Sequence, residues 1–116
     1  MSDFIVLLHE APQTLQMSPT DMQAVILKYR QWFDQLRATG RVQLSRKLRD
    51  EGGKQVRMER GRMVASDGPF AEAKDVISGV FVVSAASYDE VQGLLQGCPH
   101  FEYGWFEVRE FDVYPG

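Results

Sequence analysis

The chain has 116 residues, of which 44% are hydrophobic and 25% charged, and a formal net charge of −3. This length and balance fit a single folded domain over residues 1–116 and exclude a disordered chain. The acidic net charge excludes a chain-wide basic field, so we expect no nucleic acid partner and no membrane partner. Cys98 is the only cysteine, and neither a membrane span nor a signal peptide is evident, so we expect a soluble, cytoplasmic protein.

The first two elements are predicted to be a strand and a long amphipathic helix. Phe4 to Leu8 is a continuous apolar run, which is typical of a central strand covered on both faces or flanked by neighbours. Ser18 is placed to cap a helix that begins at Pro19 and ends before Gly40. Along this helix, one apolar stripe suited to a core is formed by Met22, Val25, Ile26, Tyr29, Phe33 and Leu36.

A short strand and a hairpin are expected next. Val42 and Leu44 alternate with polar neighbours and predict a strand, whereas Ser45 to Gly53 is interpreted as a charged, solvated loop. A two-residue turn at Arg60-Gly61 predicts a β-hairpin. Its cross-strand pairs are expected to be Glu59 with Arg62, Met58 with Met63 and Val56 with Ala65, the last two on one face.

The following segment predicts another strand and a short helix. Ile77 to Val83 is apolar and contains Gly79, which permits a bulge or the close approach of another backbone. Ser87 and Glu90 form a capping box at the start of the helix. The buried positions of that helix are expected to be Val91, Leu94 and Leu95.

The apolar residues of the last predicted strand do not all fall on one face. Phe106 and Val108 share one parity, while Phe111 and Val113 share the other. Because successive side chains of a strand alternate between faces, this change predicts a bulge or a change of sheet near Arg109-Glu110.

The predicted element order defines an α+β domain. Strand, helix, strand, hairpin, strand, helix and strand form a split βαβ plan with an added β-hairpin. Such a plan places two helices on one face of an antiparallel sheet and leaves the other face without cover from its own chain. Since Phe4 to Leu8 and Val80 to Val83 have apolar side chains on both parities, we expect a homodimer packed sheet to sheet.

The segment SDGPFAEAK, which follows the hairpin, supports two interpretations. Asp67 can accept backbone amides and Pro69 fixes the chain direction, so turn chemistry alone explains this part. In the functional interpretation, Phe70 is the wall of a pocket. Glu72 or Lys74 then supplies a polar group at its rim.

Several segments of the chain carry a family resemblance. They are VASDGPFAEAKDVISGVFVV, CPHFEYGWFEVRE, FIVLLHE, the helix MSPTDMQAVILKYRQWFDQL and the hairpin RMERGRMVASDGPF. In order and spacing they resemble the DGPF family of YCII-related proteins over nearly the whole chain. The resemblance implies a ferredoxin-like α+β fold assembled as a dimeric α+β barrel. The wider family includes enzymes acting on lactones and halogenated ring-cleavage products, and some members occur with sigma factors of the extracytoplasmic type.

Acid–base chemistry near neutral pH would use an imidazole, and the chain has two. His9 ends the first strand, where a side chain can reach a cleft, whereas His100 lies in a loop and is expected to be exposed. We predict His9 as a catalytic group with Asp67 orienting it. The resemblance to shorter YCII-like relatives implies a catalytic pair made of a His in the first helix and an Asp. Here Tyr29 falls at that His position and is predicted to be a pocket wall.

The sequence predicts no metal site and no cofactor. The two histidines and one cysteine lack the spacing of zinc motifs, and the glycines lack the spacing of a phosphate-binding loop. The first functional hypothesis is a dimeric small-molecule enzyme with acid–base or lyase-like activity on a small organic acid or lactone. The alternative is a non-enzymatic ligand-binding or interaction module linked to regulation.

Overall fold

A computed structural model of the chain describes residues 1–11, 17–67 and 76–113. The elements follow one another in the order strand, helix, three strands, a longer strand, helix, 3-10 turn and strand. Their bounds are β1 Ser2–Glu10, α1 Pro19–Ala38, β2 Val42–Lys47, β3 Lys54–Glu59, β4 Arg62–Asp67, β5 Val76–Ala85, α2 Tyr88–Leu94, η2 Pro99–Glu102 and β6 Gly104–Glu110.

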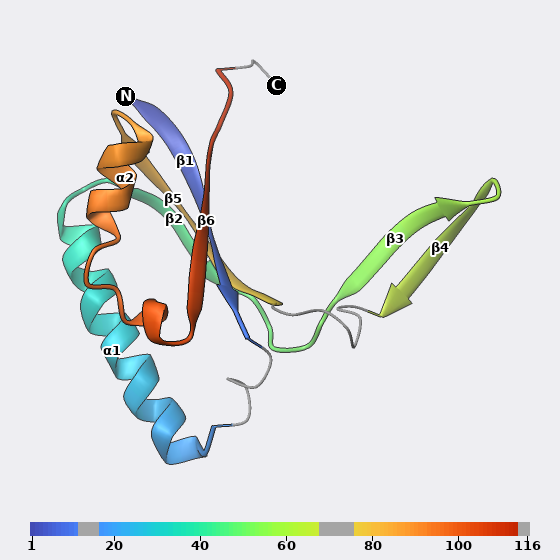
Figure 1. Ribbon diagram of the computed structural model, residues 1–116, viewed down its shortest axis with the longest axis horizontal. Coiled ribbons are helices and arrows are strands. Elements are labelled where there is room, and N and C mark those ends of the chain that lie inside the picture. Colours follow the sequence, from blue (N-terminus) through green and yellow to red (C-terminus); the bar gives the residue numbers. More distant parts are fainter. Residues whose placement is uncertain (12–16, 68–75, 114–116) are drawn as a thin grey trace.

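Four strands form an antiparallel sheet in the order β2-β5-β1-β6. Both helices lie against one face of this sheet, and the hairpin β3-β4 forms a separate two-stranded sheet (Figure 1). Because each half of the body is a strand–helix–strand unit and the two halves interleave, this is the split βαβ arrangement. The sequence-based prediction of a ferredoxin-like α+β fold with an added hairpin is confirmed.

The core lies between the helices and the covered face of the sheet. Burial alternates along β1 and β5, as expected for strands with one face in a core. The buried hydrophobic residues are Phe4, Val6, Leu8, Leu36, Phe81, Val83, Ala85, Val91, Leu95 and Cys98.

The predicted helix starts are confirmed by side-chain caps. The Ser18 hydroxyl accepts a hydrogen bond from the Asp21 amide at 3.1 Å, and Ser87 does the same for the Glu90 amide. Only part of the predicted stripe on α1 is in the core, because Leu36 alone is buried while Ile26 is exposed. The N-terminal half of α1 therefore stands off the sheet.

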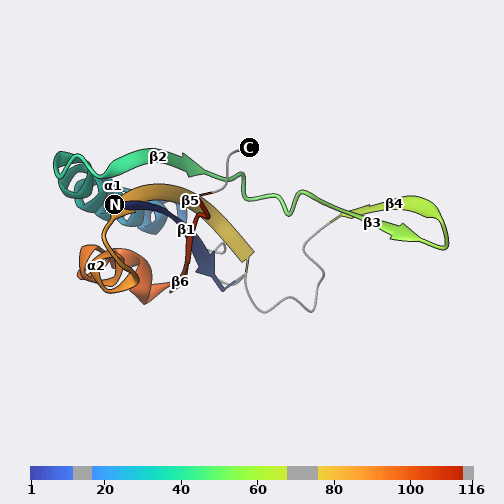
Figure 2. The same cartoon turned by 90° about the horizontal axis from the view of Figure 1, so that it is seen from above.

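The hairpin register is the predicted one. Val56 pairs with Ala65, Met58 with Met63 and Glu59 with Arg62. The turn residues Arg60 and Gly61 have positive φ angles of 51° and 77°, which the tight turn of a hairpin requires. Seen from above, the hairpin extends well away from the helices and the four-stranded sheet (Figure 2).

Two boundary predictions were wrong. Ser45 to Lys47 belong to β2 and not to a loop, because they pair with Phe81 to Gly79 of β5. The last strand does not continue past a bulge, since β6 ends at Glu110 and Phe111 and Val113 are exposed beyond it.

Gly79 lies at a shift in strand register and next to a closely approaching strand, as its lack of a side chain permits. The β1–β5 register shifts between Leu8 and His9, opposite Gly79 and Ile77. A Cβ on Gly79 would lie 3.2 Å from the Arg46 carbonyl oxygen, so β2 approaches β5 closely there. Within the three described stretches, no helix combines the length and apolarity needed to cross a membrane.

Candidate functional site

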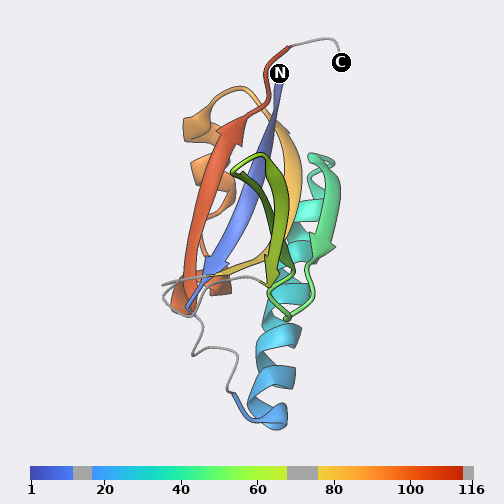
Figure 3. The same cartoon turned by 90° about the vertical axis from the view of Figure 1, so that its right-hand side faces the viewer.

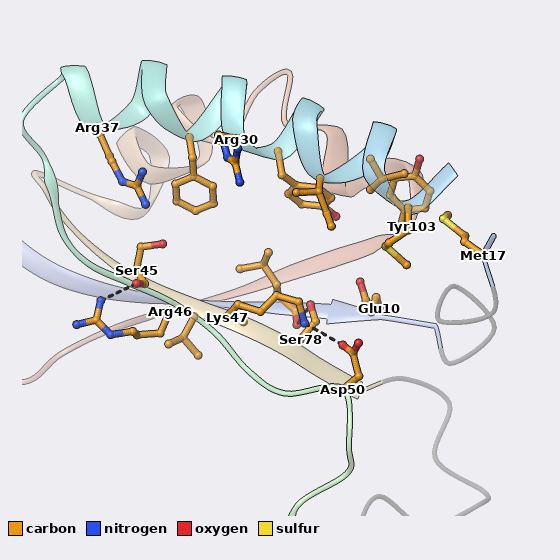
Figure 4. A pocket seen from close by; sticks show the side chains of 18 residues that line it. Glu10, Met17, Arg30, Arg37, Ser45, Arg46, Lys47, Asp50, Ser78 and Tyr103 are labelled. Carbon is orange, nitrogen blue, oxygen red and sulfur yellow. Dashed lines mark hydrogen bonds and ion pairs between the residues drawn. The ribbon is translucent and has the colours of Figure 1, made fainter. Parts of the chain in front are cut away.

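A pocket lies between α1 and the sheet, with a cavity volume of about 390 Å³ (Figure 4). This size is within the usual range for small-molecule sites. The helix contributes the apolar residues of its N-terminal half, which face the cavity instead of a filled core. The apolar part of the lining is Leu8, Met17, Met22, Val25, Ile26, Tyr29, Phe33, Val80 and Tyr103.

Glu10 places a carboxyl group in this pocket. It is the last residue of β1, two positions after the buried Leu8, and so points to the helix side of the sheet. Burial is the main cause that raises the pKa of Glu10, and Asp50 adds to the increase, whereas Lys47 and a hydrogen bond with Ser78 oppose it. A carboxyl group whose pKa is raised in a cavity can exchange a proton nearer neutral pH than an ordinary Glu.

Basic residues outnumber acidic residues around the cavity. Of the described residues that line it, four are basic, namely Arg30, Arg37, Arg46 and Lys47, and two are acidic, namely Glu10 and Asp50. Lys47 forms an ion pair with Asp50 at 2.9 Å, and Arg37 forms one with Asp34 at 3.6 Å. Among the described residues, Arg30 has no carboxylate within ion-pair distance, and it extends from α1 toward the cavity (Figure 4). The lining therefore favours an anionic ligand.

A hydrogen-bonded chain connects Tyr29 to the core below it. His100 is fully buried, its Nε2 lies 2.7 Å from the His9 carbonyl oxygen, and its Nδ1 lies 2.5 Å from the Tyr29 hydroxyl oxygen. Since a carbonyl oxygen only accepts, Nε2 carries the proton and donates it, and the Tyr29 hydroxyl donates to Nδ1. This assignment makes His100 a neutral imidazole that fixes the position of the Tyr29 oxygen at the pocket wall.

The electrostatics of this pair agree with that assignment. Burial lowers the pKa of His100, so the neutral ring is favoured, although the hydrogen bond to His9 opposes the decrease. Burial also raises the pKa of Tyr29, and the nearby charge of Glu10 adds to the increase. Both groups thus remain neutral near pH 7. The expectation that His100 is exposed was wrong, because η2 folds the loop back under α1.

His9 and Asp67 lie on different parts of the molecule. His9 follows the inward-pointing Leu8, so its side chain is on the open face of the sheet, where Nε2 lies 3.0 Å from a Glu107 carboxylate oxygen. Its ring stacks on Trp105 with a centroid distance of 4.0 Å. Asp67 ends β4 in the hairpin, with its carboxylate 2.6 Å from the Lys54 ammonium. The described contacts do not join the two residues.

Of the other predicted site residues, Tyr29 does line the pocket. Phe70, Glu72 and Lys74 lie outside the described residues. Sequence reasoning missed Glu10, Arg30 and Lys47, and it placed His100 on the surface. The sequence does hold a signal for Glu10. It lies two residues after the apolar Leu8 at the end of the first strand, so both side chains are expected on the same face of the sheet.

The fold and the pocket define a ferredoxin-like α+β protein with a cavity of small-molecule size between helix and sheet. The family model described as YCII-related domain matches residues 3–112. The chain therefore belongs to the YCII-related family. No match was found among curated proteins.

A solved structure with a similar fold is 5-chloro-2-hydroxyhydroquinone dehydrochlorinase from Burkholderia phenoliruptrix AC1100, in complex with 2,5-dihydroxybenzoquinone. The TM-score is 0.55 at 17% sequence identity, and the match covers 95% of this chain and 93% of the other. At this identity the likeness shows the shared fold.

Proposed function

We propose that the chain is an enzyme that transfers a proton on a small organic acid or lactone, and that the pocket beneath α1 is its site. The observation that carries this proposal is Glu10, a carboxyl group with a raised pKa in a cavity whose other charges are mostly basic. General-base catalysis needs a group whose pKa approaches the working pH. Electrostatic stabilisation needs cations placed where negative charge develops.

The residues of the pocket have complementary roles in such a step. The Glu10 carboxylate takes a proton from the carbon next to a carbonyl group. The electron pair of that C–H bond forms a C=C bond, and the π electron pair of the C=O bond moves onto the oxygen. Arg30 and Lys47 stabilise the resulting oxyanion, and Glu10 then returns the proton to another carbon of the conjugated system as the C=O bond re-forms. Tyr29 offers its oxygen lone pairs to a donor on the ligand, since its own proton is held by His100. The apolar side chains exclude water around the reacting atoms.

The solved relative supports acid–base chemistry of this kind. It is named a dehydrochlorinase, and removal of HCl includes the loss of a proton. At 17% identity this support concerns the type of step and not the substrate.

The alternative is a binding module that holds the same kind of anion without turnover, as part of regulation. The neutral Tyr29 and His100 pair favours this alternative, because their pKa values are shifted away from neutral pH in opposite directions. Such a pair recognises a ligand without exchanging protons with it.

His9 and Asp67 stay proposed catalytic groups, although the described contacts join His9 to Glu107 and Asp67 to Lys54. Phe70 would be the wall of their site, and Glu72 and Lys74 its rim. We also propose that two copies of the chain pack through their open sheet faces, because those faces are apolar and lack cover from helices. A cytoplasmic location is proposed from the lone Cys98, which is buried as a free thiol.

The test is a thermal-shift screen with small carboxylic acids and lactones at pH 7, followed by NMR detection of turnover for each ligand found. We expect Glu10→Gln to lower kcat/KM by about 100-fold or more, because it removes the proton-transfer group. Glu51→Gln changes an exposed carboxylate of the loop before β3 and should leave kcat/KM within about twofold. Full turnover in Glu10→Gln would reject the enzymatic proposal, and binding without turnover in the unmodified protein would favour the binding module.

A further inference from the structure

The hydrogen bonds of His100 determine where the Tyr29 hydroxyl proton lies. Nε2 of this buried ring donates to the His9 carbonyl oxygen at 2.7 Å, since a carbonyl can only accept. In the neutral ring Nδ1 is then an acceptor, and the Tyr29 hydroxyl oxygen lies 2.5 Å from it. The proton of Tyr29 is therefore directed to His100. Seen from the side of the hairpin, the helices lie behind the four-stranded sheet (Figure 3), so this pair is remote from the open face.

Packing holds the His100 ring in this orientation. Its centroid lies 4.9 Å from that of Phe106 and 5.8 Å from that of Tyr29. Turning the ring over would place carbon atoms at both oxygen partners and would break both hydrogen bonds at a buried site. The charged ring is disfavoured as well, because burial lowers the pKa of His100, although hydrogen bonds to the backbone of His9 and Trp105 oppose the decrease.

Tyr29 thus presents only lone pairs to the pocket. Its side chain lines the cavity, while its single proton is held on the other side by Nδ1 of His100. A ligand group that meets this oxygen must donate a hydrogen bond, because an acceptor there would face lone pairs with no proton between them. Carboxylate, ketone and ether oxygens cannot donate in this way, whereas a hydroxyl group can.

The charges of the cavity separate the place of a hydroxyl from the place of a carboxylate. Burial raises the pKa of Tyr29, and the charge of Glu10 adds to the increase, so Glu10 is near enough to repel an anion from the Tyr29 oxygen. Arg30 extends into the cavity from α1, and Lys47 lines its sheet side (Figure 4). A neutral donor is therefore favoured at Tyr29, and a carboxylate is favoured at the basic groups.

We propose that the pocket selects organic acids that carry a hydroxyl group, with Tyr29 as the acceptor of that hydroxyl and His100 as the positioning residue that makes Tyr29 an acceptor. The inference rests on the proposed function in one respect, namely that the pocket binds a small organic acid, and it does not require turnover. An acid whose hydroxyl is methylated has no proton to donate and leaves the Tyr29 oxygen facing an ether oxygen, so it binds more weakly.

The test compares the binding of 4-hydroxyphenylacetate and 4-methoxyphenylacetate at pH 7 by isothermal titration calorimetry. In the unmodified protein the hydroxy acid should bind more tightly by about 10-fold or more. Tyr29→Phe should reduce this ratio by about 10-fold, because the hydroxy acid loses its acceptor. Tyr103→Phe makes the same change at another tyrosine of the pocket and should leave the ratio within about threefold. The extra methyl group is the same in every protein, so a change in the ratio reports the hydrogen bond.

His100→Phe tests the positioning role separately. The Tyr29 hydroxyl can then turn and donate to the ligand, so the methoxy acid should bind about 10-fold more tightly than it does to the unmodified protein. A purely structural role of His100 would weaken the binding of both acids.

A spectroscopic measurement keeps the test decisive if His100→Phe does not fold. Nitrogen NMR of the unmodified protein should show His100 as a neutral ring with its proton on Nε2. The chain has two histidines, so His9→Gln assigns the signals.

Several results would overturn the proposal. They are no binding of the hydroxy acid, equal binding of the two acids by the unmodified protein, an unchanged ratio in Tyr29→Phe, weaker binding of both acids by folded His100→Phe, and a proton on Nδ1 of His100. A ratio that Tyr103→Phe abolishes would place the hydroxyl at Tyr103 and would overturn it too. The enzymatic proposal fails on a different result, because full turnover in Glu10→Gln rejects proton transfer by Glu10 and leaves the ratio of affinities as it is.

Discussion

Neighbouring residues of β1 meet opposite surroundings on the two faces of the sheet. Glu10 points under α1, into a pocket with basic groups and a hydrogen-bonded Ser78. His9 points to the open face, where a carboxylate and an indole ring contact it. The face that a strand residue occupies therefore decides its chemistry as much as its residue type does, because the alternation of side chains along β1 is all that separates Glu10 from His9.

The two faces of the sheet also differ in what covers them. The helix-covered face holds a pocket lined by the chain itself, in which burial shifts pKa values. The open face is apolar and is proposed to receive a second copy. A substitution that disturbs both faces of the sheet should therefore lower the free energy of unfolding more than a substitution that disturbs one face.

The largest effect is expected at Gly104, where β6 begins against β1. A Cβ there would lie 2.8 Å from the Cα of Glu10 and closer still to the His9 carbonyl oxygen. Since these are backbone atoms, the strands must separate to relieve the clash. Gly104→Ala should lower the free energy of unfolding by about 3 kcal/mol, measured by urea denaturation.

A matched control is available in α2. Gly93→Ala introduces the same methyl group where, apart from its chain neighbours and the backbone of its own helix, no described atom lies within 4 Å of the new Cβ. Because alanine favours helix over glycine, the free energy of unfolding should stay unchanged or rise by up to about 1 kcal/mol. Equal stability of the two variants would contradict the close strand approach at Gly104.

A smaller effect is expected on the helix-covered face alone. Tyr29→Phe removes the donor to His100 and leaves the buried Nδ1 without that hydrogen bond, which should lower the free energy of unfolding by about 1 to 2 kcal/mol. Tyr88→Phe removes a half-exposed hydroxyl that accepts from the Glu110 amide, and water can replace it. The control should lose less than about 0.5 kcal/mol. Equal losses in urea denaturation would show that the buried pair is not formed.

Local chemistry made much of the fold predictable. The start of α1 depends on Ser18, Pro19 and Asp21, which are within four residues of one another, and the hairpin register depends on the turn at Arg60-Gly61. The bounds of β2 were not predictable in the same way. Its last three residues are polar, and only pairing with β5 makes them a strand.

The site was harder to predict because residues distant in the chain form it. Tyr29 and His100 are 71 positions apart, and Glu10 meets Lys47 only after β5 inserts between β1 and β2. The sequence favours His9 as an acid–base group because imidazole titrates near neutral pH. Glu10 is not predictable in this way, since a raised carboxyl pKa arises from burial that no local pattern encodes.

The pH dependence of ligand turnover tests most directly whether the helix-covered face is the functional one. A general base must be ionised, so activity should fall as pH decreases through the raised pKa of Glu10, at a higher pH than for an ordinary Glu. With a ligand from the thermal-shift screen, we expect this transition in the unmodified protein and in His9→Gln, and its loss in Glu10→Gln. Loss of the transition in His9→Gln with its retention in Glu10→Gln would contradict the account and place the chemistry on the open face.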